Sequence, residues 1–347
     1  MTNNIKLPVR LPAEWEYSGA ILLSWPHAKT DWAYMLDEVQ TCFIKIVEAI
    51  STYQKVIIAA PDIEIPQKQL THIAKDKIFY FKTPTNDTWA RDFGPITIQD
   101  ANGTFHPLDF RFNGWGLKFP SCFDNCINRN AAACRLIYSP LIDNQDFVLE
   151  GGGIESDGNG SLMTTAYCQL SPNRNSHLTA SEIKSQLINR LGGKQVLWLE
   201  YGYLAGDDTD SHIDTLARFA PDNTIVYVGC DNPDDEHFDE LMAMKNELCR
   251  MRTLDHKPYN LIELPLPDPI YDDDGQRLPA TYANFLALPQ AVIMPVYNQP
   301  QKDRLASMII SVAYNRPVIE VDCRALIKQH GSLHCVTMQI PQSVLSI

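Results

Sequence analysis

The stretch "FVLEGGGIESDGNGSLMTT", residues 147 to 165, places a carboxylate and three consecutive glycines between two short strand-like runs. Glu150 follows the apolar end of the first run, and the glycines come directly after it. A glycine run behind a strand is usually turn chemistry, because glycine adopts backbone angles that other residues avoid. It is not a phosphate-binding P-loop, since no Gly-Lys-Ser or Gly-Lys-Thr follows. The stretch therefore predicts a tight strand connection that carries an acidic side chain.

Three further stretches place polar side chains close to strand-like runs. They are "NDTWARDFGP" at 86–95 with Asp92, "GDDTDSHIDTLARF" at 206–219 with His212 and Asp214, and "KQHGSLHCVTMQIP" at 328–341 with Cys335. The successive gaps from Asp92 through Glu150 and His212 to Cys335 are 58, 62 and 123 residues, and the last is close to twice the others. Similar modules of about 60 residues, each supplying one functional group from its inner end, would give this spacing.

Helical and strand-like segments alternate along the chain, which indicates α/β structure with no composition break that would mark a linker. We therefore predict one domain over residues 1–347. The apolar patterns predict helices over residues 31–53, 179–193, 235–251 and 301–314 and strands over residues 19–25, 55–61, 195–200, 260–266 and 317–323. Thr179 and Glu182 form a capping-box pattern at one helix start. Residues 111–135, rich in Phe, Asn, Cys and Gly, predict a long loop.

The composition of the chain argues against several classes of function. A net charge of −13 disfavours nucleic-acid binding, which needs clustered Lys and Arg, and it is compatible with a cationic substrate. The longest apolar runs are far shorter than the roughly 20 residues of a membrane span. The N-terminus lacks the apolar run of a signal peptide, so we expect a cytoplasmic protein. Nine cysteines, an odd number, indicate reduced thiols rather than a disulfide framework.

His212 and Asp214 form a His-x-Asp pair whose role the sequence leaves open. On a strand, residues two apart point to the same face, where a carboxylate can fix the imidazole tautomer for acid–base work. His212 is equally compatible with a satisfied structural histidine. Cys335 precedes an apolar run that continues through Val336 and Met338, so it is either ordinary strand packing or a nucleophile.

A metal site is a further alternative, because Asp208, Asp210 and Asp214 alternate as they do in hard-cation loops. The stretch lacks the central glycine and the terminal glutamate of an EF-hand. Cys122 and Cys126 form a close pair, but no second pair at ligand spacing completes a zinc site. Both metal sites are therefore disfavoured.

Eight motifs in register resemble the agmatine deiminase family, also called agmatine iminohydrolase, of the guanidine-modifying enzymes. They are "LPAEWEYSGAILLSWP", "TWARDFGP", "FRFNGWG", "LEGGGIESDGNGSLMTT", "SPNRN", "DTDSHID", "YANFLALPQAVIMPVYNQPQKD" and "HGSLHCVTMQIP", and they cover nearly the whole chain. The resemblance implies a pentein fold, a five-bladed pseudo-symmetric α/β propeller of ββαβ-type modules with the active site in its central channel. It implies no metal or organic cofactor and a small cationic guanidine as the partner. A homodimer is kept as a hypothesis with no interface assigned.

The resemblance also assigns roles to residues of this chain. Asp92 and Glu150 match the carboxylates that bind guanidinium, His212 matches the general acid/base, and Cys335 matches the nucleophile. Asp214 would be a second partner of the guanidinium or of the histidine. Trp89 matches an aromatic side chain that lines the channel.

The chemistry of a guanidinium suits these residue types. The group is planar and always protonated, so its recognition calls for bidentate carboxylates. The Cys335 thiolate would add to the central carbon, and His212 would protonate the departing ammonia. Water activated by His212 would then hydrolyse the thiouronium intermediate. Agmatine would give N-carbamoylputrescine by this route.

Three alternatives stay open. The substrate could be free arginine, peptidyl-arginine or another guanidine, because "HGSLHC" and "FNGWGLK" differ from the usual Gly-Gly-Gly-Asn-Ile-His-Cys and Phe-Asn-Ala-Trp-Gly-Gly runs of agmatine enzymes. Free arginine would need a cation for its carboxylate, and neither Arg91 nor Arg218 has an evident role of that kind. The other two alternatives are a metal-dependent hydrolase built on "DDTDSHID" and a non-catalytic binding protein with the same fold.

Overall fold

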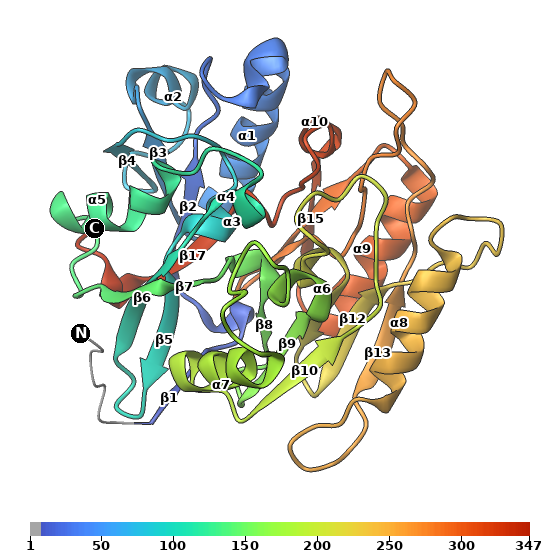
Figure 1. Ribbon diagram of the computed structural model, residues 1–347. Coiled ribbons are helices and arrows are strands. Elements are labelled where there is room, and N and C mark those ends of the chain that lie inside the picture. The colour runs from blue at the N-terminus through green and yellow to red at the C-terminus, as the bar shows by residue number, and fades with distance from the viewer. Residues whose placement is uncertain (1–7) are drawn as a thin grey trace.

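The protein is a mixed α/β structure in which helices pack around several small sheets (Figure 1). A computed structural model describes residues 8–347. The strands are β1 (Val9–Arg10), β2 (Gly19–Ser24), β3 (Lys55–Ala60), β4 (Ile78–Lys82), β5 (Ile96–Asp100), β6 (Phe105–Arg111), β7 (Ile142–Val148), β8 (Glu155–Ser156), β9 (Ser161–Thr165), β10 (Gln195–Leu199), β11 (Ala217–Ala220), β12 (Thr224–Val228), β13 (Asn260–Leu264), β14 (Leu286–Ala287), β15 (Val292–Val296), β16 (Val318–Asp322) and β17 (Met338–Pro341). The α-helices are α1 (Leu36–Ser51), α2 (Glu64–Gln69), α3 (Ala90–Phe93), α4 (Gly114–Leu117), α5 (Ile127–Ala133), α6 (Ala166–Gln169), α7 (Ala180–Leu191), α8 (Phe238–Arg250), α9 (Pro300–Tyr314) and α10 (Arg324–Ile327). Within this part of the chain, none of them has both the length and the apolar character of a membrane span.

The strands of residues 8–347 form five sheets, and each sheet contains the same three-strand unit. In each unit the first strand runs antiparallel to the second, and the second runs parallel to the third. The units are β17-β2-β3, β5-β6-β7, β8-β9-β10, β11-β12-β13 and β14-β15-β16. Each parallel step needs a crossover, and helices such as α1, α7, α8 and α9 provide it. The predicted α/β class is confirmed, while closure of the five units into a propeller ring stays a prediction.

The two ends of the described chain share one sheet, because β17 pairs antiparallel with β2. Pro341 lies opposite Gly19, where a Cβ would come within 2.2 Å of the carbonyl oxygen of Ile340. Glycine therefore permits the close approach of these strands. The pairing fixes the segment just before β17, which carries Cys335, beside the first half of the chain.

The predicted helices and strands are confirmed to within a few residues. The helix expected from residue 31 begins as a 3-10 turn at Asp31–Met35 and continues as α1. Helix α1 directs its apolar face to the core through Val39, Phe43, Ile46, Val47 and Ile50. The capping box of Thr179 and Glu182 is present, and Gly192 ends α7 in the left-handed conformation at φ 71°.

The prediction of a long loop over residues 111–135 is wrong in part. The segment contains α4, a 3-10 turn at Asp124–Cys126, and α5. Ile127 and Ala131 are one helical turn apart and both buried, so α5 has an apolar face that the polar composition concealed. The carboxylate of Asp124 accepts hydrogen bonds from the backbone nitrogens of Asn86 and Asp87 at 2.8 and 3.0 Å. These bonds tie the segment to the chain just before Trp89.

Candidate active site

Five polar side chains of the site each stand shortly before the first strand of a repeated unit. Asp92 lies in α3 before β5, Glu150 precedes β8, His212 precedes β11, and Cys335 precedes β17. The fifth position belongs to Asn284, which lies two residues before β14. Asn284 lies 72 residues after His212 and 51 residues before Cys335. The gap of 123 residues between His212 and Cys335 was therefore the sign of a further unit with its own polar side chain, which the sequence analysis did not identify.

Cys335 is buried beside a carboxylate and an amide. Its Sγ lies 3.2 Å from Nδ2 of Asn284 and 3.8 Å from Oδ2 of Asp214. The amide oxygen of Asn284 accepts hydrogen bonds from the backbone nitrogens of His334 and Cys335, which fixes the loop that carries the sulfur. Burial, followed by the nearby carboxylates of Asp214 and Asp92, raises the pKa of the thiol well above its ordinary value. Thiolate formation is therefore favoured when a cation enters the site.

His212 lies between two carboxylates. Its Nδ1 is 3.6 Å from Oδ1 of Asp92, and its Nε2 is 3.8 Å from Oε2 of Glu150. Burial alone would lower the pKa of the imidazole, but Asp92, Cys168 and Glu150 outweigh burial and raise the pKa well above its ordinary value. The ring is therefore held as an imidazolium, the form that protonates a leaving nitrogen.

Asp214 does not orient His212 in the way that strand geometry predicted. Ile213–Thr215 is a 3-10 turn, so the two side chains do not share the face of a strand. Oδ2 of Asp214 instead accepts a hydrogen bond from Nδ1 of His334 at 2.7 Å. Its Oδ1 is buried and has no hydrogen-bond partner among the described residues. Because buried polar atoms are nearly always paired, this oxygen is suited to a ligand.

The glycine run at residues 151–153 allows these side chains to converge. A Cβ on Gly152 would lie 2.7 Å from Nδ1 of His212, 2.8 Å from Oδ1 of Asp92 and 3.1 Å from Oδ2 of Asp214. The backbone nitrogen of Gly152 also donates a hydrogen bond to Asp92 at 2.9 Å. The run is therefore more than a turn, because only glycine permits this close approach.

Glu150 is fully buried and faces an arginine of the chain itself. Nε of Arg174 donates to its two carboxylate oxygens at 2.8 and 3.1 Å, and Nη1 of Arg174 donates to Asp210 at 2.5 Å. Burial would raise the pKa of Glu150, but Arg174 and His212 lower it to about 2. Glu150 thus contacts Arg174 and His212. Arg174 belongs to the motif "SPNRN", but sequence reasoning did not place it in the site.

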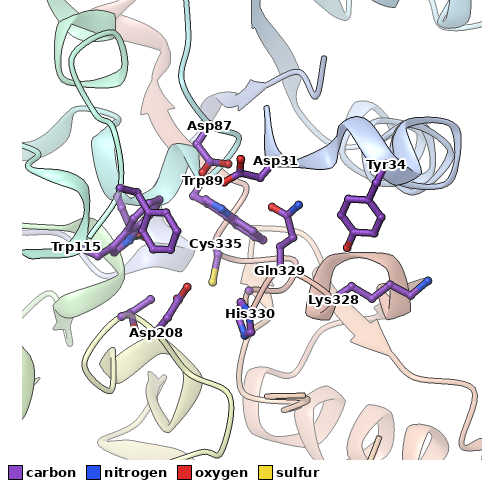
Figure 2. Close-up of a pocket in the computed structure, with 14 residues that line it drawn as sticks. Asp31, Tyr34, Asp87, Trp89, Trp115, Asp208, Lys328, Gln329, His330 and Cys335 are labelled. Atoms are coloured by element: carbon purple, nitrogen blue, oxygen red, sulfur yellow. Dashed lines mark hydrogen bonds between the residues drawn. The ribbon is translucent and has the colours of Figure 1, made fainter. Parts of the chain in front are cut away.

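A pocket of about 360 Å³ leads to Cys335 (Figure 2). Trp89 and Trp115 line it, and Trp89 covers Gly331, where a Cβ would lie 2.3 Å from the indole ring. Trp115 has a φ of 53°, in the left-handed region that is unusual for a bulky residue. In this conformation its Nε1 donates a hydrogen bond to Oδ2 of Asp92 at 2.9 Å. Trp115 therefore fixes the Asp92 carboxylate, a contact that its motif "FRFNGWG" did not reveal.

The same pocket is also lined by the acids Asp31, Asp87 and Asp208 (Figure 2). Burial raises the pKa of Asp87 to about 7, and the neighbouring charges of Asp31 and Asp208 add to this effect. Lys328 lines the pocket too, but its Nζ lies 3.2 Å from both carboxylate oxygens of Glu38. Within residues 8–347, no salt bridge links a lysine or arginine to any of the three acids. This part of the pocket therefore favours a ligand with positive charge.

Two clusters of potential metal ligands lie close to the site. Their ligand atoms fall within 4.8 Å of one another in the groups Glu150, Cys168 and His212, and Glu14, Glu155 and His334. Arg174 forms an ion pair with Glu150, and Arg218 forms ion pairs with both Glu14 and Glu155. An arginine guanidinium thus already supplies positive charge to each cluster, so neither fits an additional cation well.

The alternating acids of residues 207–214 do not converge on one point. Asp210 forms ion pairs with Lys118 at 2.6 Å and Arg174 at 2.5 Å, while Asp214 accepts from His334. Within the described residues, Asp208 and Asp210 belong to neither group of potential ligands. The geometry therefore gives the metal-dependent alternative no support.

A buried thiol, an imidazolium and several carboxylates at equivalent ends of repeated α/β units are what an enzyme acting on guanidinium groups requires. The protein thus has the fold of the guanidine-modifying class, and the residue types at its candidate site suit a guanidinium substrate. The family model of the Porphyromonas-type peptidyl-arginine deiminases matches residues 10–341, and the chain belongs to this family.

Proteins similar to this chain are named after different substrates. A relative from Vibrio parahaemolyticus, provisionally named agmatine deiminase, is 30% identical over 95% of this chain and 96% of its own. The crystal structure of a protein from Porphyromonas gingivalis, provisionally named arginine deiminase, is 46% identical, with a TM-score of 0.91 over 97% of this chain and 99% of that one. A cysteine-to-serine variant of agmatine deiminase from C. jejuni, with substrate bound, is 40% identical, with a TM-score of 0.89 over 95% and 96% of the two chains. The choice of substrate therefore depends on the pocket.

Proposed function

We propose that the protein hydrolyses the guanidinium group of agmatine to give N-carbamoylputrescine and ammonia. The observation that carries this choice is the charge of the pocket. Cys335 and Asp92 line it, and so do Asp31, Asp87 and Asp208. Agmatine has a guanidinium at one end and an ammonium at the other, so acids at both ends of the pocket would match its two charges. The similar agmatine deiminases of other organisms support the same substrate.

The guanidinium would bind between Asp92 and Asp214, against the face of the Cys335 thiol. Asp214 would use Oδ1, the oxygen that has no partner among the described residues. The incoming cation would offset the carboxylate field that raises the pKa of Cys335, and the thiol would release its proton to solvent as substrate binds. Substrate binding and activation of the nucleophile are thereby coupled.

Two displacement steps would follow. The Cys335 sulfur adds to the guanidinium carbon, His212 donates a proton to one NH₂ group, and the carbon–nitrogen bond breaks to release ammonia. His212, now neutral, removes a proton from water as the water attacks the S-alkylthiouronium carbon. The carbon–sulfur bond then breaks as the hydroxyl proton passes to the departing sulfur, which releases N-carbamoylputrescine and regenerates the Cys335 thiol. Each cycle consumes one water and leaves the enzyme unchanged.

Free arginine fits the pocket less well than agmatine, because its α-carboxylate requires a cation. Lys328 lines the pocket but has its Nζ at the Glu38 carboxylate, and neither Arg91 nor Arg218 lines the pocket, so three acids outnumber one lysine there. The α-carboxylate would instead meet the acids Asp31, Asp87 and Asp208. Such like-charge contacts disfavour binding.

Peptidyl-arginine is the second candidate, because its backbone carries no free carboxylate at this position. A groove of about 660 Å³ adjoins the first pocket and shares Tyr34 and Lys328 with it. It has room for chain beyond an arginine side chain. The family description names the same class of substrate.

Ammonia release from agmatine, arginine and a blocked arginine amide tests the proposal on the wild type and on Cys335→Ala. We expect the highest kcat/KM for agmatine and no turnover of any substrate by Cys335→Ala. Asp87→Asn should lower kcat/KM for agmatine about tenfold while affecting the arginine amide less, because it removes one acid near the ammonium. Faster turnover of the amide than of agmatine would overturn the substrate, and activity in Cys335→Ala would overturn the mechanism. A cytoplasmic location, a single domain, the absence of a cofactor and a homodimer stay predictions from the sequence.

A further inference from the structure

The N-terminal motif "LPAEWEYSGAILLSWP" reaches the reaction centre through Glu14, which no step of the proposed mechanism uses. Glu14 begins a 3-10 turn at Glu14–Glu16 and is buried. Its Oε1 accepts a hydrogen bond from the backbone nitrogen of Ala287 at 2.6 Å. Its Oε2 lies 2.6 Å from Nε2 of His334, the residue directly before Cys335. A segment more than 300 residues away in sequence thus contacts the nucleophile's neighbour.

His334 bridges two carboxylates. Its Nδ1 lies 2.7 Å from Oδ2 of Asp214, and its Nε2 lies 2.6 Å from Oε2 of Glu14. An ionised carboxylate oxygen only accepts hydrogen bonds, so a contact this short requires a proton on each ring nitrogen. Nη2 of Arg218 also lies 3.1 Å from Nε2 of His334, but this distance is longer than the 2.6 Å from Nε2 to Oε2 of Glu14, so the carboxylate is the closer partner of Nε2. The geometry therefore assigns His334 as an imidazolium that donates in both directions.

The charges around this imidazolium are balanced. Arg218 pairs with Glu14 and Glu155, and Nη2 of Arg91 lies 3.8 Å from Glu14. The buried charged groups that face or adjoin His334 are Glu14, Glu155, Asp214, Arg91 and Arg218. With His334 protonated, three anions face three cations. Loss of the imidazolium charge would leave one buried anion uncompensated, a state that favours protonation of a carboxylate.

We propose that His334, supported by Glu14, is a positioning residue that holds Asp214 ionised with its Oδ1 directed to the guanidinium of the substrate. The hydrogen bond to Oδ2 fixes the rotation of the Asp214 side chain and leaves Oδ1 without a protein partner. It also engages the oxygen that lies 3.8 Å from the Cys335 sulfur. Glu14 acts through His334, since it has no contact of its own with Asp214. This inference rests on the proposed function in one respect: it needs a substrate with a guanidinium group, but it does not need that substrate to be agmatine.

The test uses His334→Gln, Glu14→Gln and the double variant, with two readouts. The first is the rate of Cys335 alkylation by iodoacetamide at increasing millimolar guanidinium ion. Whether bound guanidinium speeds alkylation by favouring the thiolate or slows it by covering the sulfur, the concentration dependence gives a dissociation constant without turnover. The second is kcat/KM for ammonia release from agmatine. Both are measured from pH 6 to pH 9, and thermal unfolding of each variant shows whether it is folded.

We expect His334→Gln to weaken guanidinium binding and kcat/KM by about 10- to 100-fold near pH 6, the effect of losing one charge-assisted hydrogen bond. Burial raises the pKa of Asp214, while the hydrogen bond and charge of His334, followed by the charges of His212 and Arg218, lower it; the loss of His334 therefore raises that pKa. The deficit should therefore shrink as pH rises and Asp214 ionises again. Glu14→Gln should weaken guanidinium binding and kcat/KM less than His334→Gln does, with the same dependence on pH. In the double variant it should weaken them no further than His334→Gln alone.

Glu155→Gln is the matched control, because it removes a carboxylate from the same cluster that pairs with Arg218 and not with His334. We expect it to change the guanidinium dissociation constant less than His334→Gln does, and without the same dependence on pH, because Asp214 keeps its hydrogen bond from His334. The proposal would be overturned if His334→Gln weakened guanidinium binding and kcat/KM equally at every pH, or did not weaken them at all. So would an equal effect of Glu155→Gln. If wild type binds guanidinium but releases no ammonia from agmatine, the proposed substrate fails while the positioning role is still measured.

Discussion

Replacement of Arg174 by methionine would test the electrostatics of the site, because Arg174 is the counterion of Glu150. The side chain of Arg174 is 1% exposed and donates to both oxygens of Glu150 and to Asp210. Methionine fills similar space without the charge. Asp210 keeps Lys118 at 2.6 Å, so Glu150 is the carboxylate that loses its cation.

The expected loss of stability follows from the pKa of Glu150. That pKa is lowered from 4.5 to about 2, and since one pKa unit is worth about 1.4 kcal/mol, the ionised Glu150 contributes roughly 3 kcal/mol at neutral pH. This contribution is present above the ordinary pKa and is lost as the pH falls through about 2. Removal of one partner of a buried pair costs a similar amount, about 3–5 kcal/mol. We therefore expect Arg174→Met to be destabilised by about 3 kcal/mol or more at pH 7.

The loss should depend on pH. Without Arg174, burial dominates and raises the pKa of Glu150 above its ordinary value, so the folded variant binds a proton that wild type does not. Its stability relative to wild type should therefore rise as the pH falls from 8 to 5. Urea unfolding midpoints at several pH values in this range measure the difference.

Arg190→Met is the matched control, because Arg190 forms a two-bond ion pair with Asp146, whose side chain is 70% exposed. The Arg190 side chain is 17% exposed, but its partner Asp146 is open to solvent, and such a pair contributes about 0–1 kcal/mol; we therefore expect a smaller loss than in Arg174→Met. The assignment of Arg174 as the counterion of Glu150 is wrong if Arg174→Met lowers the free energy of unfolding no more than Arg190→Met does. It is also wrong if the loss of stability in Arg174→Met is the same at pH 5 and pH 8.

The remaining predictions concern the nucleophile and the metal alternative. Asn284→Ala should lower kcat by about 10- to 100-fold with little change in KM, because the amide holds the Cys335 loop and contacts its sulfur; wild-type kcat would contradict this role. Asp214→Asn should speed alkylation of Cys335 by iodoacetamide at pH 7 about tenfold, since it removes a carboxylate that raises the pKa of the thiol; an unchanged or slower rate would refute the reasoning. EDTA should leave ammonia release unchanged, and inhibition that added metal reverses would restore the metal-dependent hypothesis.

Much of the site could be predicted from the sequence, because the residue types limit the chemistry. The resemblance to guanidine-modifying enzymes assigned roles to the acids, the histidine and the late cysteine, and the spacing of 58 and 62 residues suggested repeated modules. The doubled gap of 123 residues already implied one more module. Asn284 could not be named from it, because an amide has no distinctive local pattern.

Other contacts could not be predicted because they depend on long-range packing. The sequence placed Asp214 beside His212, two residues away, but the 3-10 turn directs it to His334 instead. Arg174 and Glu14 lie in quoted motifs whose side-chain partners are distant in the chain. Proximity in sequence was therefore a poor guide to which charges pair.

The sequence by itself determined the α/β modules, the family resemblance and the candidate catalytic residues, because periodicity, glycine positions and functional side chains are local properties. Only the tertiary structure decided how those side chains are charged and oriented. The protonation of His212, the ionisation of Glu150 and the free oxygen of Asp214 each depend on neighbours brought from other units. Burial removes water from all of them at once, so their energies are set by these contacts and not by the order of residues in the chain.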